Sequence, residues 1–439
     1  MSQPNSSTNR RVQVTTLGCK LNQYDSEMLL TQLRSEGFSE TDSARDADLV
    51  VINTCAVTET AERKGRAAVR AALRQNSSAK VVATGCLAER SAESLLKAGA
   101  QQVFGNREKE RLSEILASEN KVQIGGIRND QPWSNWTVVD WMSRRVRAFL
   151  KIQDGCSQLC TYCIVPKLRG KGRSLPSEQA VRRAEELVSR GFQEIVVTGV
   201  ALGTYGFDAD QRDSLPDVIT ALSKIQGLKR LRLGSVEPWA ISERFLHTVA
   251  DSEVICPHLH LPFQSGCDEV LHRMNRRYTV AELRNKLDYA FKLRDDWGIG
   301  ADIIVGFPGE STEQFEATKQ FIESAHISYL HVFPFSTRPG TAATKLGGNL
   351  PQAELTRRAN ELRDISRQLR KNFHQKHVGT RVEAIAENRG SSRFVYGHAR
   401  NYADVAMPLE GVRTGQIAQF YVERADADFL YCKPIGQEI

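Results

Sequence analysis

Cys156-Ser157-Gln158-Leu159-Cys160-Thr161-Tyr162-Cys163 is the stretch around which the rest of the chain is organised, and it sets three thiols at a C-x3-C-x2-C spacing. A closed structural zinc site takes four protein ligands, and a disulfide framework pairs its cysteines, so three thiols fit neither. Three thiolates on a loop after the apolar run 148–152 match three irons of a four-iron, four-sulfur cluster. The fourth iron is then left open.

An iron with an open position binds a small chelating ligand and passes it an electron, which is how radical chemistry on S-adenosylmethionine begins. The spacing, with Tyr162 before the third cysteine, resembles the radical SAM superfamily. The alternative is three unrelated buried cysteines, because free cysteine is among the most buried residue types.

Length and composition bound the kind of protein. A chain of 439 residues predicts about two to four domains, and 41% hydrophobic with 25% charged residues is typical of a globular protein. No uncharged apolar run of about 18 residues occurs, and the first eleven residues are polar, so we expect neither a membrane-spanning nor a secreted protein. Nine cysteines, an odd number, favour reduced metal-binding thiols and a cytoplasmic location.

The positive charge is concentrated around the triple-cysteine loop. The formal net charge is +7, and residues 142–190 carry eleven Lys or Arg against four acids. Such an excess favours a polyanionic partner. Arg169 and Arg173 are candidates for phosphate contacts, with holding the loop or a cofactor carboxylate as the alternative.

The N-terminal region predicts a parallel α/β domain. Three β-branched runs, 12–16, 49–53 and 80–84, are each followed by a helix-like segment. One cysteine follows each run: Cys19, Cys55 and Cys86. Because ligand sites of open α/β sheets lie at the carboxyl ends of the strands, we expect these three thiols to converge as ligands of a second cluster. Three independent small core residues are the alternative.

The central region predicts an incomplete barrel. Strand candidates at 148–152, 194–198, 230–233, 258–261, 301–305 and 329–333 alternate with helical patterns, which gives six βα units and places the chemistry at the strand carboxyl ends. Glycine turns and polar groups at these ends are expected to bind the nucleoside-bearing cofactor. The candidates are Tyr162, Gly199, Ser235, Glu237, Gln264, Ser265 and Asp302.

The residue pattern of the last region differs from that of the central region. After a charged helical pattern at 350–375, five short β-type runs (381–386, 393–399, 404–407, 417–422 and 429–433) predict a small β-barrel. The predicted division is a disordered start at 1–11, an α/β domain at 12–124, a Trp-containing linker at 125–143, the partial barrel at 144–373 and the β-barrel at 374–439.

This arrangement resembles the methylthiotransferase family of radical SAM enzymes from about residue 12 to the end of the chain. The family's opening motif is present as Leu17-Gly18-Cys19-Lys20-Leu21-Asn22-Gln23, and its Lys-Leu-Asn form is similar to the MtaB-type branch. The resemblance implies that Cys156, Cys160 and Cys163 bind the radical SAM 4Fe–4S cluster and that Cys19, Cys55 and Cys86 bind an auxiliary one.

The resemblance also implies a reaction. S-adenosylmethionine would be cleaved to a 5′-deoxyadenosyl radical and would also donate the methyl group, so that carbon 2 of threonylcarbamoyladenosine beside the tRNA anticodon gains a methylthio group. It implies a C-terminal TRAM module that grips tRNA, and a reducing partner such as a flavodoxin or ferredoxin. The alternatives are isopentenyladenosine in tRNA, a ribosomal-protein aspartate, or a non-catalytic RNA-bound iron–sulfur redox protein.

Five further side chains have simpler interpretations. Cys256, Cys267 and Cys432 stand at no ligand spacing and are predicted to be structural. His258 and His260 alternate on a predicted strand, so they face one side of it, in the core or at the barrel mouth.

Overall fold

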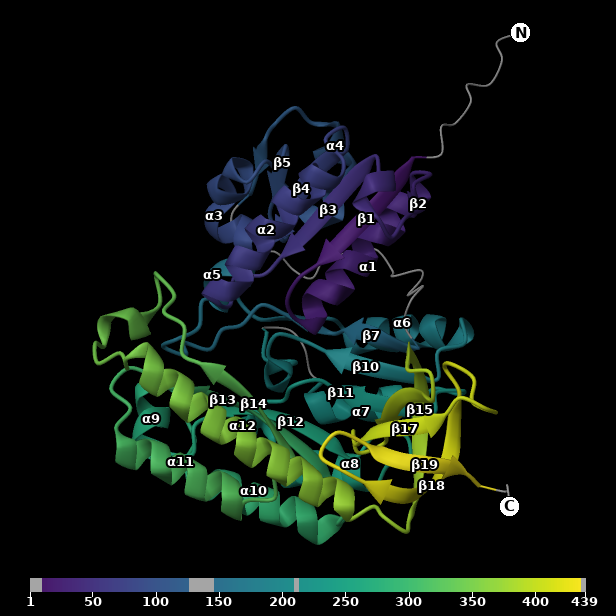
Figure 1. The fold of residues 1–439 in the computed structure, drawn as a ribbon, viewed down its shortest axis with the longest axis vertical. Helices are drawn as coiled ribbons and strands as arrows, with labels where there is room; N and C mark the ends of the chain where they lie inside the picture. The colour runs from purple at the N-terminus through teal and green to yellow at the C-terminus, as the bar shows by residue number, and fades with distance from the viewer. Residues whose placement is uncertain (1–9, 126–145, 209–212, 436–439) are drawn as a thin grey trace.

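The structure is a computed structural model that describes residues 10–125, 146–208 and 213–435. An α/β domain stands above a half-open barrel of strands and helices, and a small β-barrel packs against the side of that half-open barrel (Figure 1). The predicted fold class is therefore confirmed. The predicted linker, with Trp133, Trp136 and Trp141, lies outside the described residues except for Gly125. Of the predicted disordered start, only Arg10 and Arg11 are described.

The N-terminal sheet has six parallel strands in the order β2-β1-β3-β4-β5-β6. They are β1 (Arg11–Thr16), β2 (Ser39–Glu40), β3 (Leu49–Thr54), β4 (Lys80–Gly85), β5 (Gln102–Phe104) and β6 (Val122–Gln123). Sequence patterning found β1, β3 and β4. It missed the others because two or three residues are too short to show a period.

Helices cover both faces of this sheet. The four helices are α1 (Lys20–Ser35), α2 (Glu59–Gln75), α3 (Cys86–Lys97) and α4 (Leu112–Ala117). Val69 of α2 and Leu95 of α3 pack on one face of the sheet, whereas Leu33 of α1 and Ile115 of α4 pack on the other. The strands alternate between these two cores, and the sheet is consequently buried on both sides.

The central body contains the six predicted strands. They are β7 (Arg147–Lys151), β10 (Glu194–Thr198), β11 (Arg230–Leu233), β12 (His258–Gln264), β13 (Gly298–Val305) and β14 (Tyr329–Pro334). Two parallel sheets, β11-β10-β7 and β12-β13-β14, are joined by single bridges between Leu231 and Ile255 and between Ser235 and His260. A curved, half-open barrel results, with its hydrophobic core between the strands and the outer helices.

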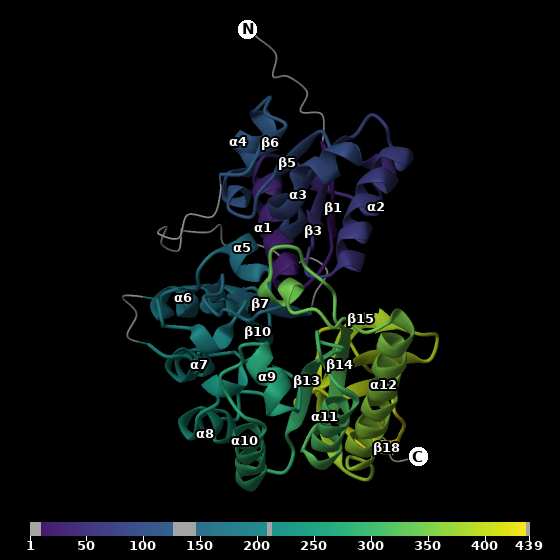
Figure 2. The ribbon, with the colours of Figure 1, turned by 90° about the vertical axis from the view of Figure 1, so that its left-hand side faces the viewer.

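Helices wrap the outside of this barrel. They include α6 (Ser177–Ser189), α7 (Leu215–Ser223), α8 (Glu243–Ala250), α10 (Val280–Leu293) and α11 (Thr312–Ser324). Thr279 caps α10 and Ser311 caps α11, each in a reciprocal capping box. The long helix α12 (Gln352–Gln375) lies along the edge strand β14 and then leads into the C-terminal module (Figure 2). None of the described helices is long and apolar enough to cross a bilayer.

The C-terminal module is a closed five-stranded barrel in the order β15-β16-β17-β19-β18. Its strands are β15 (Arg381–Gly390), β16 (Phe394–Ala399), β17 (Asp404–Pro408), β18 (Ile417–Ala425) and β19 (Leu430–Pro434), and the barrel is consistent with a TRAM module. It is joined to the central body by buried polar contacts. Arg230 and Arg232 of β11 donate hydrogen bonds to the backbone carbonyls of His398, Ala399 and Arg400.

Candidate iron–sulfur and cofactor site

The three N-terminal cysteines lie at one edge of the sheet, as predicted. Cys19 is the N-cap of α1, Cys55 follows the last residue of β3, and Cys86 is the first residue of α3. The strands β1, β3 and β4 are neighbours, so their carboxyl ends meet there. The side chain of Cys19 makes no capping hydrogen bond, which leaves its thiol for another partner.

Two glycines allow the three loops to approach one another. Gly18 and Gly85 have φ values of +104° and +97°, which side-chain-bearing residues rarely adopt. A Cβ on Gly18 would lie 2.8 Å from Cβ of Cys55, and a Cβ on Gly85 would lie 2.3 Å from the carbonyl oxygen of Thr54. The residue before Cys19 and the residue before Cys86 are therefore both required to be glycine.

The pKa shifts of these thiols are consistent with their binding an iron–sulfur cluster. Burial raises the pKa of the Cys55 thiol to about 12, although a hydrogen bond from the Val57 backbone N–H opposes the change. Burial also raises the pKa of Cys86, against the opposing effect of the Arg169 guanidinium. A buried thiolate needs a positive partner, and a cluster iron supplies one directly. Backbone N–H groups and a guanidinium directed at sulfur are the groups that tune such clusters.

The second set of cysteines sits at the carboxyl end of β7, after the short strand β8 (Gln153–Asp154). The backbone N–H of Gln158 donates to Sγ of Cys156 over 3.4 Å, and Nη1 of Arg276 donates to Sγ of Cys160 over 3.5 Å. Burial raises the pKa of Cys156 to about 11 and that of Cys163 to about 12. These thiols thus have the same character as the first set.

Arg276 was not found by sequence reasoning. Its Nη2 donates to the Pro262 carbonyl over 2.5 Å and its Nε to the Tyr278 hydroxyl over 3.1 Å, which fixes the guanidinium beside Cys160. Tyr162, a predicted cofactor residue, packs in the same place, and burial raises its pKa. The sequence does not single out Arg276, because other basic residues stand beside it after the short helix α9 (Asp268–Arg273).

The spread of the thiols argues against a single ion. A tetrahedral zinc with bonds of about 2.3 Å would draw its thiolates to about 3.8 Å from one another. Among the described residues, neither cysteine set has its Sγ atoms within 4.8 Å of one another. A cube with an iron at each ligated corner holds its ligands further apart, so both sets fit clusters better than they fit zinc.

The structure changes the interpretation of Arg169. Arg169 was a candidate for a phosphate contact, with holding the loop or a cofactor carboxylate as the alternative. It is only 5% exposed and lies at the junction of the α/β domain and the barrel. Its Nη2 donates to Asn22 Oδ1 at 2.8 Å and to Asp25 Oδ2 at 3.0 Å, and its Nη1 to Asp154 Oδ1 at 3.1 Å. The alternative role, holding the loop, is the one observed for Arg169. Arg173 is also largely buried, 3.7 Å from Asp154.

A buried charge network surrounds Arg169. Asp25 accepts hydrogen bonds from Lys109 at 2.9 Å and Lys151 at 2.7 Å, and Lys151 also contacts Asp154 at 3.2 Å. Burial by itself would raise the pKa of Asp25, but these cations hold it well below its ordinary value. The basic excess of the sequence is therefore partly internal, with Arg183 also buried. Arg169 joins the two cysteine sites, because it follows the second set in sequence and contacts Asn22, next to the first.

Comparison with known proteins agrees with this geometry. Residues 11–105 match the family described as "Uncharacterized protein family UPF0004", and residues 150–322 match the radical SAM superfamily. The threonylcarbamoyladenosine tRNA methylthiotransferase MtaB of Aquifex aeolicus is 38% identical over 86% of this chain and 94% of its own length. The chain belongs to the radical SAM methylthiotransferase family. It is accordingly a radical SAM enzyme, and its family implies one 4Fe–4S cluster and S-adenosylmethionine.

One further relative and one solved structure show how closely membership of this family defines the substrate and the fold. The tRNA-2-methylthio-N(6)-dimethylallyladenosine synthase of Fervidobacterium nodosum is 33% identical over 88% of this chain and 90% of its own length. The structure of the radical S-adenosylmethionine methyltransferase TsrM from Kitasatospora setae has a TM-score of 0.56, covering 74% of this chain and 73% of that one at 14% identity. At that identity the likeness concerns the fold.

The predicted cofactor residues of this methylthiotransferase lie on the carboxyl-terminal loops of the barrel, apart from Asp302. Glu237 is buried and accepts the Gly203 N–H at 2.8 Å, which ties two of these loops together. Gln264 has a φ of +73°, which is unusual for a residue with a side chain, and Ser265 contacts Thr318 at 3.2 Å. Ser235 is exposed and forms a single β-bridge with His260. Their contacts to S-adenosylmethionine stay predictions, as does that of Gly199.

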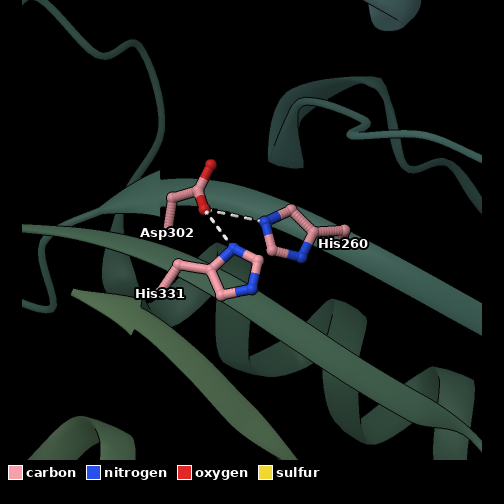
Figure 3. Close-up of side chains that lie close together, drawn as sticks. All are labelled: His260, Asp302 and His331. Atoms are coloured by element: carbon pink, nitrogen blue, oxygen red, sulfur yellow. Dashed lines mark hydrogen bonds and ion pairs between the residues drawn. The ribbon is translucent and has the colours of Figure 1, made fainter. Parts of the chain in front are cut away.

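Asp302 has a different setting. It lies inside β13 rather than at its end, and its Oδ1 is 2.8 Å from Nε2 of His260 and 3.3 Å from Nδ1 of His331 (Figure 3). Burial would raise the pKa of Asp302, but the hydrogen bonds from the two imidazoles hold it below its ordinary value. His258, on the same face of β12 as His260, is buried and hydrogen-bonded to the hydroxyl of Tyr329. Both histidines face the interior of the enzyme.

The remaining cysteines and a hollow at the far end of the barrel lie outside the two cysteine sets. Cys256, Cys267 and Cys432 are all buried. A hollow of about 840 Å³ opens between the end of α12, the start of β13 and the C-terminal barrel. It lies near the amino ends of the barrel strands, opposite the cysteine loops, so it does not mark the chemistry.

Proposed function

We propose that this enzyme methylthiolates carbon 2 of threonylcarbamoyladenosine beside the anticodon of tRNA. It would use two 4Fe–4S clusters, with S-adenosylmethionine as both radical source and methyl donor. The observation that carries the proposal is the presence of two three-thiol sites, each at strand carboxyl ends, joined through Arg169 and Asn22. A single radical SAM cluster would require only one of them.

The choice of substrate within the family rests on the relatives and on the opening motif. MtaB proteins from Aquifex aeolicus and four other bacteria are 33 to 38% identical to this chain. Relatives named for dimethylallyladenosine reach similar identities, so identity alone leaves that base as the second candidate. The Lys20-Leu21-Asn22 sequence after Cys19 favours the MtaB-type branch.

The chain's own residues have distinct tasks in this reaction. Cys156, Cys160 and Cys163 would hold the radical SAM cluster, and Cys19, Cys55 and Cys86 the auxiliary one. When bound, these groups supply a 5′-deoxyadenosyl radical and a sulfur atom ready for methylation. The positioning is supported by Arg169, which follows the second set and contacts Asn22 beside the first, so a base held between the α/β domain and the barrel would lie near both sets.

The binding partners follow from the same reaction. The closed C-terminal barrel contacts the central body through Arg230 and Arg232 and would grip the tRNA. A low-potential donor such as a flavodoxin or ferredoxin would reduce the clusters. A tRNA substrate and nine reduced cysteines support a cytoplasmic location.

Nucleoside mass spectrometry tests the proposal directly. The anaerobically reconstituted enzyme is incubated with S-adenosylmethionine, a reductant and tRNA that bears either threonylcarbamoyladenosine or dimethylallyladenosine. We expect 2-methylthio product only on the first tRNA. Product only on the second would replace the proposed substrate with the second candidate, and cofactor cleavage without methylthio product on either tRNA would contradict the proposed reaction.

A further inference from the structure

A polar chamber inside the half-barrel receives residues from all three bodies of the protein. The barrel contributes His260, Asp302 and His331 from three neighbouring strands (Figure 3). The C-terminal module contributes Tyr402, whose ring stacks on His258 with centroids 4.5 Å apart. Tyr402 has a φ of +70°, so its loop adopts an unusual backbone conformation to place the ring there.

Lys20 of the N-terminal domain extends into the same chamber. Its ammonium lies within electrostatic reach of Tyr402, Arg232 and Asp302. The Lys20 side chain is solvent-exposed, so a ligand that enters the chamber can reach its ammonium. Among the residues that the structure describes, Lys20 makes no ion pair or side-chain hydrogen bond. An accessible cation without a protein partner favours an anionic ligand.

A metal ion is a poorer occupant of this chamber. Two imidazoles and one carboxylate with ligand atoms within 4.8 Å of one another do resemble a metal site. However, both imidazoles already contact Asp302 Oδ1, and Lys20 and Arg232 add positive charge nearby. The arrangement instead fixes His331, because an Nδ1–H donated to Asp302 leaves Nε2 of that ring available on a half-exposed side chain.

The position of Lys20 in the chain matches the geometry of the proposed substrate. Lys20 directly follows Cys19, a ligand of the proposed auxiliary cluster. In adenine, carbon 2 and carbon 6 flank the same ring nitrogen, and carbon 6 carries the exocyclic N6. A base with carbon 2 at the sulfur-delivering cluster therefore presents its N6 substituent within reach of a lysine that starts beside that cluster.

We propose that Lys20 and His331 form the subsite for the carboxylate-bearing side chain on N6 of the substrate base. This inference rests on the proposed function and adds its basis for specificity. Lys20 pairs with the carboxylate, and His331, oriented by Asp302, hydrogen-bonds the polar atoms beside it. An apolar N6 substituent would leave Lys20 unpaired in the chamber, and the site therefore discriminates against such a substituent.

Binding of three anticodon stem-loop RNAs to the reconstituted full-length enzyme tests this subsite. The RNAs carry threonylcarbamoyladenosine, its methyl ester, or unmodified adenosine at the same position. The ester keeps the size of the side chain and removes only its charge. We expect the wild-type enzyme to bind the acid about 10- to 100-fold more tightly than the ester, as for loss of one charge-assisted contact.

Single-residue variants show which side chains cause the preference for the acid over the ester. Lys20→Met should bind acid and ester equally, whereas Lys20→Arg should keep most of the preference. Lys97→Met removes the same charge from an exposed surface position and should behave as wild type. Iron content is measured for each protein, because Lys20 neighbours a proposed ligand. His331→Gln, remote in sequence from every proposed ligand, should weaken binding of the acid and the ester alike, because both carry the polar atoms that His331 contacts. If Lys20→Met loses iron, the wild-type comparison of acid with ester and the His331→Gln result decide the matter.

Two outcomes would overturn the subsite. One is a wild-type enzyme that binds acid and ester equally, and the other is a full preference retained by Lys20→Met with iron intact, together with undiminished binding of both RNAs by His331→Gln. Either can occur while the wild-type enzyme still converts threonylcarbamoyladenosine in tRNA, so the proposed function would stand. Absence of product on that tRNA is the separate result that would remove the proposed function itself.

Discussion

Replacing Asp25 with Asn should loosen the junction between the α/β domain and the barrel. Asp25 is 2% exposed and contacts three cations, Lys109, Lys151 and Arg169, at 2.7 to 3.0 Å. Together with Asp154, the five groups carry three positive and two negative charges, and the variant raises their net charge from +1 to +2. Asn has nearly the same volume, so the change is almost purely electrostatic.

The loss of folding free energy in the variant has an upper limit, because the excess charge can be removed by deprotonation of a buried lysine. Burial already lowers the pKa of Lys151, so it is the group that would lose its proton. Folding with a neutral lysine at pH 7.5 costs about 4 kcal/mol relative to a free side chain of pKa about 10.4, and at pH 9 about 2 kcal/mol. The first value agrees with the roughly 3–5 kcal/mol seen when a buried pair loses one partner.

The pH dependence has a definite sign. In the variant the folded state binds fewer protons than the unfolded state between the depressed pKa of the lysine and about 10.4, so stability relative to wild type rises with pH. Hydrogen exchange of amides in α1 and β7, measured at pH 7.5 and 9, gives the opening free energy of the junction. The control is Asp46→Asn, which disturbs a surface pair with Arg11 worth about 0–1 kcal/mol. A loss below about 1 kcal/mol at pH 7.5, or a loss that does not shrink at pH 9, would refute the argument.

Four further results are expected. Changing all three cysteines of the C-x3-C-x2-C loop to Ala should reduce the iron content from about eight to about four per chain, as counted by iron analysis and Mössbauer spectroscopy. Cys55→Ala should still cleave S-adenosylmethionine reductively yet form no methylthio product, and full product would exclude the auxiliary role. Arg169→Ala should lower stability and iron content rather than the salt dependence of tRNA binding, because its guanidinium is buried among carboxylates. A chain that ends at Phe373 should fail to fold its barrel, which circular dichroism and proteolysis would detect, because Arg230 and Arg232 would lose the backbone acceptors that they bury.

The sequence predicted the elements of this protein where the chain is periodic and long enough. The six barrel strands and the five strands of the C-terminal barrel were found because their apolar runs are bounded by turn residues. The edge strands β2, β5 and β6 were missed because two or three residues have no period. The position of Cys19, Cys55 and Cys86 at one sheet edge was also predictable, since parallel strands end on the same side.

What the sequence alone determined is the identity and local spacing of the candidate ligands, because a C-x3-C-x2-C loop brings its thiols together through chain connectivity. Only the tertiary structure decided which charges are internal. Arg169 and Lys151 are indistinguishable in sequence from solvent-exposed basic residues, yet both are buried against Asp25, which is more than a hundred residues away in the chain. Likewise, Lys20, Asp302 and Tyr402 share one chamber because three separately patterned bodies pack together. Burial and charge pairing depend on contacts remote in sequence, and no local pattern encodes them.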